Sequence, residues 1–397
     1  MSGPVLRVPG VYRQEQIERR TPVLPTGVPV FVGFVDSAAP IPEGAPGSES
    51  VYGPVALHRK TDFPGGALGY LRDSIDGFFD NGGGYCHVVG VRIDPVATLR
   101  TADALIDALA LAAPLADVDL VAIPDAAALL AAAGEDVAAG EDRFLRVQRA
   151  LIKHCTEQAG RVALLDALPR KDARALINSH VKKLGLSSNG PVNAALYHPW
   201  IRGVSTGTRF VPPCGHVAGV IARTDALGGV YRAPANVEIL GATDLDADLD
   251  ADSLGLLNDS GVNCLRALPG RGIRVWGART LSTASEWRFL NVRRLVLTLQ
   301  RWIDLNMAWA AFEPNVPALW TRIQRELTHY LGGLWRKGAL QGDAIDDAFY
   351  VRCTAELNPQ QTREAGQVVT EIGLAPTVPA EFIVVSVQHR AGTTELI

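Results

Sequence analysis

The segment Gly203–Gly207, GVSTG, fits the G-x-S-x-G pattern that surrounds the nucleophile of many serine hydrolases. In those enzymes the serine lies on a sharp turn between a strand and a helix, and backbone amides at the turn stabilise the oxyanion. Here Ser205 is followed by TGTRFVPPCG, and Pro212 and Pro213 oppose a helix in that stretch. We therefore expect an ordinary turn, with an α/β serine hydrolase using Ser205 as the alternative hypothesis.

Other residue types that do chemistry are scattered. The closest histidines are 18 positions apart (198 − 180 and 216 − 198), so no H-x-x-x-H metal pair exists, and Cys214 with His216 supplies only two ligands. The dipeptide Gly-Lys does not occur, which excludes a Walker A loop. The acidic run 244–252 lacks the glycine and glutamate spacing of a calcium loop and is typical of a solvated connector. We expect no cofactor and no metal.

Composition indicates a globular protein. Of 397 residues, 47% are hydrophobic and 20% charged, and a net charge of −4 gives no indication of nucleic-acid binding. The start MSGPVLRVPGVYRQ lacks the features of a secretory signal, and no apolar run reaches the ~18 residues of a membrane helix. Five scattered cysteines without a C-x-x-C pair suggest reduced, buried thiols; they are Cys86, Cys155, Cys214, Cys264 and Cys353.

The first hundred residues predict an extended arm followed by the first strands and helix of an α/β domain. Prolines at 4, 9, 22 and 25 favour an extended arm over residues 1–25. The run 27–35 predicts a buried strand, and the Pro-, Gly- and Ser-rich stretch 36–66 predicts a loop. Apolar residues from Leu68 to Phe79 have helical spacing, NGGG ends that helix, and 85–93 predicts the next strand.

Residues 100–200 alternate between helical and strand patterns. We predict helices over 101–113, 141–159 and 170–185 and strands over 117–125, 161–168 and 192–200. This β-α-β-α-β order implies a parallel sheet with right-handed crossovers. Asp125 and Asp166 lie near carboxyl ends of these strands, where α/β enzymes place catalytic groups.

After about residue 270 the pattern predicts an α+β domain. A strand over 272–279 precedes two long helices, near 285–309 and 315–337, and strands are predicted over 349–357, 367–374 and 381–389. In the first helix an apolar stripe is formed by Val292, Leu295, Leu299, Trp302, Ile303 and Trp309.

Several stretches together resemble the tail sheath family of contractile phage tails and phage-tail-like contractile injection systems. They are PGVYRQEQ with GVPVFVGFV, GFFDNGGGYCHVVGV, VPPCGHVAGVIARTDALGGVYRAPAN, LNDSGVNCLR, VWGARTLS and APTVPAEFIV. Their order extends over nearly the whole chain. The resemblance implies a linking arm at 1–25, a subtilisin-like but non-catalytic α/β domain at 26–268, a C-terminal α+β domain at 269–390 and a C-terminal arm at 391–397.

The resemblance also implies a structural protein and not an enzyme. Such subunits polymerise helically around an inner tube and contract from a metastable extended state, driving the tube through a target envelope. Implied partners are other copies of this chain, the inner tube, and baseplate and terminal cap proteins, with no nucleic acid and no membrane insertion. The implied location is the bacterial cytoplasm during assembly, and afterwards a phage tail or tail-like particle.

Family members link subunits by adding strands from their arms to sheets of neighbours, through backbone hydrogen bonds. The candidate linking residues here are Val8, Val11, Tyr12, Ile17, Val385, Val387 and His389. Val385, Val387 and His389 alternate onto one face of a strand, although 381–389 could equally begin as an internal strand.

The resemblance places the C-terminal domain against the inner tube. The candidate tube-facing residues are Arg322, Arg325, Arg336 and Lys337 on the second long helix. A basic face could meet an acidic tube through contacts weak enough to break during contraction. The alternative is a solvated face with cations near a helix C-terminus.

Overall fold

The computed structural model describes residues 24–41, 46, 50–94, 101–130, 136–158, 160–186, 190–204 and 206–381, with the backbone of 387–390 and 393–396. A nine-stranded sheet organises the larger part, in the order β2-β3-β1-β4-β5-β6-β10-β11-β8, in which β2 is Val51–Leu57, β11 is Gly272–Trp276 and β8 is Val237–Glu238. Its centre runs parallel through β3 (Cys86–Ile93), β1 (Pro29–Asp36), β4 (Leu120–Ala122), β5 (Val162–Asp166), β6 (Ala194–His198) and β10 (Val262–Leu268). The predicted parallel α/β sheet is confirmed.

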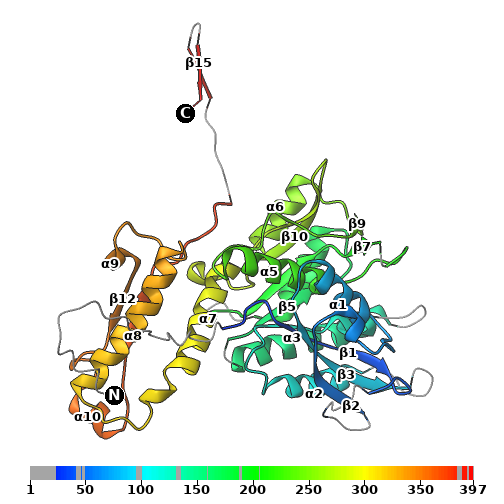
Figure 1. Cartoon of the computed structure of the whole chain (residues 1–397). Helices are drawn as coiled ribbons and strands as arrows, with labels where there is room; N and C mark the ends of the chain where they lie inside the picture. Colours follow the sequence, from blue (N-terminus) through cyan, green and yellow to red (C-terminus); the bar gives the residue numbers. More distant parts are fainter. Residues whose placement is uncertain are drawn as a thin grey trace, which may run out of the picture.

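Helices cover both faces of this sheet, as Figure 1 shows. On one face pack α2 (Ala102–Leu109), α3 (Val137–Glu157) and α4 (Ala173–Leu176); on the other pack α1 (Leu71–Asp80) and α5 (Cys214–Gly228). The pleat of β1 divides its side chains accordingly, with Val32 and Phe34 in one core and Phe31 and Val35 in the other. Burial on both faces explains the continuous apolar run of β1.

Several elements differ from the sequence predictions. The stretch 36–66 is not all loop, because β2 (Val51–Leu57) pairs antiparallel with β3. Sequence analysis also missed α5, α6 (Ala251–Asp259), β7 (Ile201–Gly203), β8 (Val237–Glu238), β9 (Ala242–Leu245) and β10. The strand predicted over 272–279 is β11 (Gly272–Trp276), which pairs with β10 and so belongs to the large sheet and not to the C-terminal group.

The C-terminal part is built on two long helices, α7 (Leu290–Asn306) and α8 (Pro317–Arg336). Leu290 and Leu297 of α7 pack into the α/β body, whereas Leu295 and Leu299 pack toward α8. Helix α7 therefore joins the two parts, and Figure 1 shows it between them. Beyond α8 lie α9 (Ile345–Ala348), the antiparallel pair β12 (Phe349–Arg352) and β13 (Glu371–Leu374), and α10 (Gln360–Glu364).

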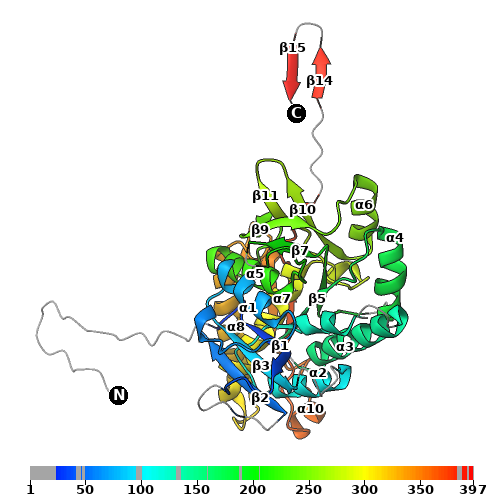
Figure 2. The same cartoon turned by 90° about the vertical axis from the view of Figure 1, so that its right-hand side faces the viewer.

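The last strands form a hairpin of β14 (Val387–Arg390) and β15 (Thr393–Leu396). Figures 1 and 2 show this hairpin apart from the rest of the molecule. Among the described helices none is long and apolar enough to cross a membrane.

Candidate functional site

The G-x-S-x-G segment follows β7. Ser205 itself lies outside the described residues, but its neighbours form a turn in which the Thr206 amide donates to the Gly203 carbonyl over 3.2 Å. Val211 then pairs back with Ile201, and the next helix, α5, begins only at Cys214. The strand–turn–helix context of a nucleophile elbow is therefore not built around this segment.

The two aspartates at strand ends are buried and bind backbone amides. Asp125 accepts from the Phe34 amide at 2.6 Å and from the Tyr70 amide, which ties β1 to the start of α1. Asp166 accepts from the Cys214 amide at 2.8 Å, at the N-terminus of α5. Burial raises the Asp166 pKa to about 7. Both carboxyl groups are buried and thus hold elements of the fold in place.

All five cysteines are free and buried, as predicted. Burial and the neighbouring Asp166 carboxyl raise the Cys214 pKa well above the ordinary thiol value, so this thiol is a poor nucleophile. Within the described ranges, no group of three or more His, Cys, Asp or Glu side chains could hold a metal ion.

The start of the chain's described part is anchored to a buried carboxylate. The Gly27 and Val28 amides donate to Asp119 over 3.1 and 2.7 Å. Gly27 has φ +72°, and a Cβ there would lie 2.6 Å from the Cα of Ala222 on α5. Only glycine fits this backbone conformation and this close contact with α5. The segment after the N-terminal arm is therefore held in one position on the body. The arm residues Val8, Val11, Tyr12 and Ile17 lie outside the described residues.

The same Asp119 belongs to a buried ion cluster. Arg294 of α7 donates to Asp119 at 2.7 Å and to both carboxylate oxygens of Asp225 at 2.8 and 2.6 Å. Desolvation works against the Arg294 charge, but the two carboxylates outweigh it and hold its pKa above the ordinary arginine value. The cluster joins α7, α5 and the segment that leads to β1. Sequence analysis missed it, since its members are 69 and 175 positions apart.

The C-terminal arm candidates are only partly described. Val385 lies outside the described residues, and Val387 and His389 lie in β14, opposite Leu396 and Thr394 of β15. The role of these residues in linking subunits stays a prediction. Strand structure is described over 387–390, where the sequence predicted 381–389.

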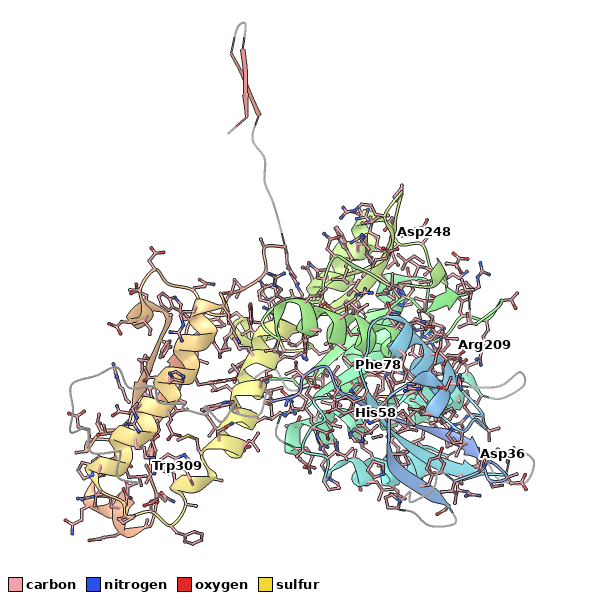
Figure 3. All side chains as sticks on the ribbon, viewed as in Figure 1. Asp36, His58, Phe78, Arg209, Asp248 and Trp309 are labelled. Carbon is pink, nitrogen blue, oxygen red and sulfur yellow. The ribbon has the colours of Figure 1, made fainter. Side chains whose placement is uncertain are left out.

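The four candidate tube-facing cations are all exposed on α8 or at its end. The Arg322 guanidinium lies 3.5 Å from the centre of the Trp309 ring and pairs with Glu326 at 3.5 Å. It therefore also holds the loop between α7 and α8. Figure 3 shows Trp309 at the lower end of the C-terminal part. Arg336 and Lys337 lie about 17 Å farther along the helix than Arg325. The structure thus presents two pairs of cations along one helix rather than one cluster.

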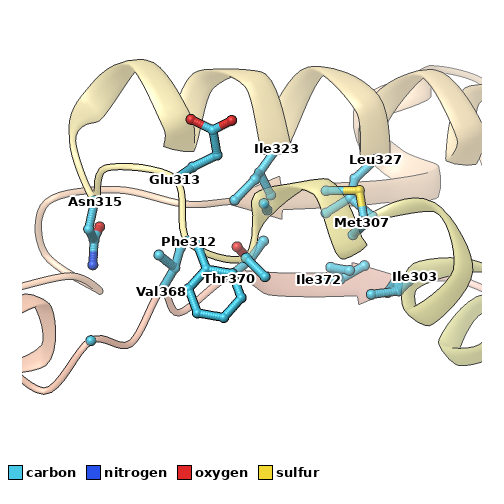
Figure 4. Close-up of a pocket in the computed structure, with 13 residues that line it drawn as sticks. Ile303, Met307, Phe312, Glu313, Asn315, Ile323, Leu327, Val368, Thr370 and Ile372 are labelled. Carbon is cyan, nitrogen blue, oxygen red and sulfur yellow. The ribbon is translucent and has the colours of Figure 1, made fainter.

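An apolar cavity of about 780 Å³ opens beside that loop. Figure 4 shows Met307, Ile323, Leu327 and Ile372 lining it, with Phe312 at its mouth. The Phe312 side chain is fully exposed and its φ is +67°. An exposed aromatic ring beside an apolar cavity is typical of a surface that contacts another molecule.

Comparisons with known proteins agree with one another. The model of the phage tail sheath protein central domain matches residues 121–281, and that of the phage tail sheath C-terminal domain matches 282–390. A prophage tail sheath relative from Pseudomonas aeruginosa (strain UCBPP-PA14) is 29% identical over 183 residues, which are 45% of each chain. The match thus spans less than half the length of this relative.

Solved structures resemble almost the whole chain. A chain in the cryo-EM structure of the anti-feeding prophage (AFP) baseplate has a TM-score of 0.72 and 26% identity, covering 98% of this chain and 100% of that one. A chain in the AFP helical sheath in the contracted state has a TM-score of 0.73 and 26% identity, covering 97% and 100%. Together with the two family models, which meet at residues 281 and 282, these likenesses show that the chain belongs to the phage tail sheath family.

Proposed function

We infer that the protein is the structural subunit of a contractile sheath. It polymerises helically around an inner tube and contracts from a metastable extended state, which drives the tube through a target envelope. The observation that carries this conclusion is the likeness, over 97% of the chain, to a helical sheath in its contracted state. Members of this family are structural components of contractile tails, so the protein is not an enzyme. The Ser205 hydrolase alternative has no support.

The finer domain picture is part of the proposal. An N-terminal arm over 1–25 and a C-terminal arm over 391–397 flank an α/β domain and an α+β domain. We place the junction of the two domains at residues 281 and 282 rather than at 268 and 269, because β11 belongs to the large sheet and the two family models meet there. The α/β domain is subtilisin-like in fold and non-catalytic.

The arms link subunits by adding strands to sheets of neighbouring copies. Among the described strands, β12 and β13 pair only with each other, so the outer edges of this two-stranded sheet are candidate sites for such pairing. The family likeness supports assembly with further copies of the chain, and the baseplate relative supports a place beside baseplate proteins. Contact with an inner tube and a terminal cap, and assembly in the bacterial cytoplasm, complete the proposal.

The tube contact is assigned to Arg322, Arg325, Arg336 and Lys337. All four are exposed on one helix of the C-terminal domain. Exposed ion pairs are individually weak and screened by salt, which suits contacts that must break during contraction.

Negative-stain electron microscopy of the purified chain tests the proposal. We expect hollow, uniform cylinders for the intact chain and for Ser205→Ala, and no cylinders after deletion of residues 1–20. The same preparations are assayed for hydrolysis of short ester substrates. If the intact chain stays monomeric both alone and with its tube protein, or if Ser205→Ala abolishes a measurable esterase activity, the sheath assignment is wrong.

A further inference from the structure

The chain returns from the C-terminal domain to the α/β body before it reaches β14. After β13, Ala375 and Thr377 pair with the backbone near Ala339, where the Thr377 amide donates to the Ala339 carbonyl over 3.1 Å. Asn291 of α7 then donates to the Thr377 carbonyl at 3.1 Å. Four residues later, Glu381 meets Arg279, which follows β11 of the large sheet. Glu381 is thus the last described residue of the body before β14.

Arg279 is held in position independently of Glu381. Its amide donates to the Asn263 side chain of β10 over 2.7 Å, and its Nη1 donates to the Asn258 carbonyl at the end of α6 over 2.8 Å. Its side chain is only 9% exposed. The other edge of the guanidinium, formed by Nε and Nη2, is therefore held in a fixed orientation in which it can bind one carboxylate.

Glu381 binds that edge with both oxygens. Arg279 Nε donates to Oε1 at 3.0 Å, and Nη2 donates to Oε2. Two parallel hydrogen bonds between ionised groups form the strongest and most directional pairing available to a carboxylate. With the Glu381 side chain 19% exposed, solvent screens the pair only in part. Losing Glu381 would leave a buried guanidinium edge unpaired.

Between Thr377 and Glu381, the three described residues have no comparable contact with the body. Val378 and Ala380 are exposed, and Pro379 has no amide hydrogen to donate. A pull on the chain beyond residue 381 would therefore peel this short stretch from the body unless the Arg279 pair resisted it. The pair lies where tension from a linked neighbour would enter the subunit.

We propose that Arg279 and Glu381 are positioning residues that clamp the chain to the α/β body where it leaves toward β14 and the C-terminal arm, so that the arm leaves every subunit from the same point and in the same direction. This inference rests on the proposed sheath function. The clamp matters for linkage and not for folding of the subunit, because it ties down only the exit of the chain.

Glu381→Gln tests the clamp, since it removes the charge and keeps the size. Its matched control is Glu356→Gln, an exposed glutamate of the same domain. We expect both variants to melt within about 3 °C of the natural chain, because Glu356 is exposed and a glutamine at 381 keeps one acceptor for Arg279, whose bonds to Asn258 and Asn263 remain. The fraction of Glu381→Gln found in cylinders should fall about tenfold or more, in line with the loss of one charge-assisted hydrogen bond within each subunit, where the chain leaves the body. Glu381→Asp should restore part of it.

A distance measurement reports the clamp directly. The five native cysteines are buried, so spin labels can be placed on Asp252→Cys of α6 and Ala380→Cys, both exposed positions. We expect one narrow distance distribution in the monomer, and a broad one once Glu381→Gln is added. An unchanged distribution, or full assembly of Glu381→Gln, overturns the clamp and leaves the sheath function standing. Failure of the natural chain to assemble at all counts against the sheath function instead.

Discussion

At the residue scale, Arg294 has the largest predicted effect on stability. Its side chain is 2% exposed and it neutralises Asp119 and Asp225 together. Arg294→Met should lower the free energy of unfolding by about 3–5 kcal/mol, because two buried carboxylates lose their only arginine partner in the cluster. Urea unfolding followed by circular dichroism measures this change.

The control for that variant is Arg325→Met, which removes an exposed arginine and should change the free energy of unfolding by less than about 0.5 kcal/mol. A loss of under about 1 kcal/mol for Arg294→Met would show that the cluster contributes little net stability.

Asp166 should make stability depend on pH in an unusual direction. Burial raises its folded-state pKa to about 7, whereas an unfolded aspartate titrates near 3.9. Between these values the folded state binds the extra proton, so stability falls as pH rises from about 4 to 7. Asp166→Asn keeps an acceptor for the Cys214 amide and removes the titration. From pH 5 to pH 8, the natural chain should lose about 3 kcal/mol relative to Asp166→Asn.

Denaturant unfolding at the two pH values measures that difference directly. The buried histidines titrate equally in both proteins and cancel in the comparison. Parallel pH profiles for the two proteins would mean that Asp166 is ionised throughout this range.

At the element scale, the contact between α1 and α5 depends on glycine. A Cβ at Gly219 would lie 2.4 Å from the Phe78 carbonyl oxygen and 2.6 Å from the Asn81 Cβ. Gly219→Ala should therefore destabilise the protein by about 1–3 kcal/mol, although alanine is the better helix former. Gly255→Ala on α6 is the matched control, since no atom lies within 4 Å of its Cβ. It should stabilise by up to about 1 kcal/mol. Thermal denaturation measures the melting temperature of both variants. If both variants shift the melting temperature in the same direction, the proposed role of Gly219 is wrong.

A comparison of the helices shows what periodicity in the sequence could and could not predict. Helix α8 was found because it buries one face and exposes the other, and α7 because polar residues interrupt its apolar stripe at helical spacing, although its first ten residues are nearly all buried. Helix α5 is buried without a break from Cys214 to Ala222, so its sequence has no polar face to mark a helical period. Strand β2 was missed because Gly53 and Pro54 interrupt it where its register shifts. Arg279 and Glu381 are 102 positions apart, and no local pattern could pair them.

At the scale of the whole molecule, the C-terminal domain is attached to the body along α7, through Leu290, Leu297 and the Arg294 cluster. Its outer helix α8 therefore keeps a fixed orientation relative to the sheet. Surfaces on α8 can meet a central tube in every subunit at the same angle, which a helical assembly requires.

The proposed tube contact of the basic residues of α8 can be tested separately from self-assembly of the chain. Replacing Arg322, Arg325, Arg336 and Lys337 together by glutamine should still allow the chain alone to form cylinders, since the linking arms are unchanged. Co-expressed with its tube protein, the variant should form few extended sheaths. The natural extended sheath should weaken as salt rises from 50 to 500 mM, because the screening length falls below about 10 Å. Electron microscopy counts the cylinders formed by the chain alone and the extended sheaths formed with the tube.

The matched control replaces four exposed cations of the α/β body by glutamine: Lys171, Arg174, Lys182 and Lys183. This control should leave the number of extended sheaths unchanged. Normal extended sheaths from the α8 variant would move the tube contact to another surface, with the apolar rim around Phe312 the next to test.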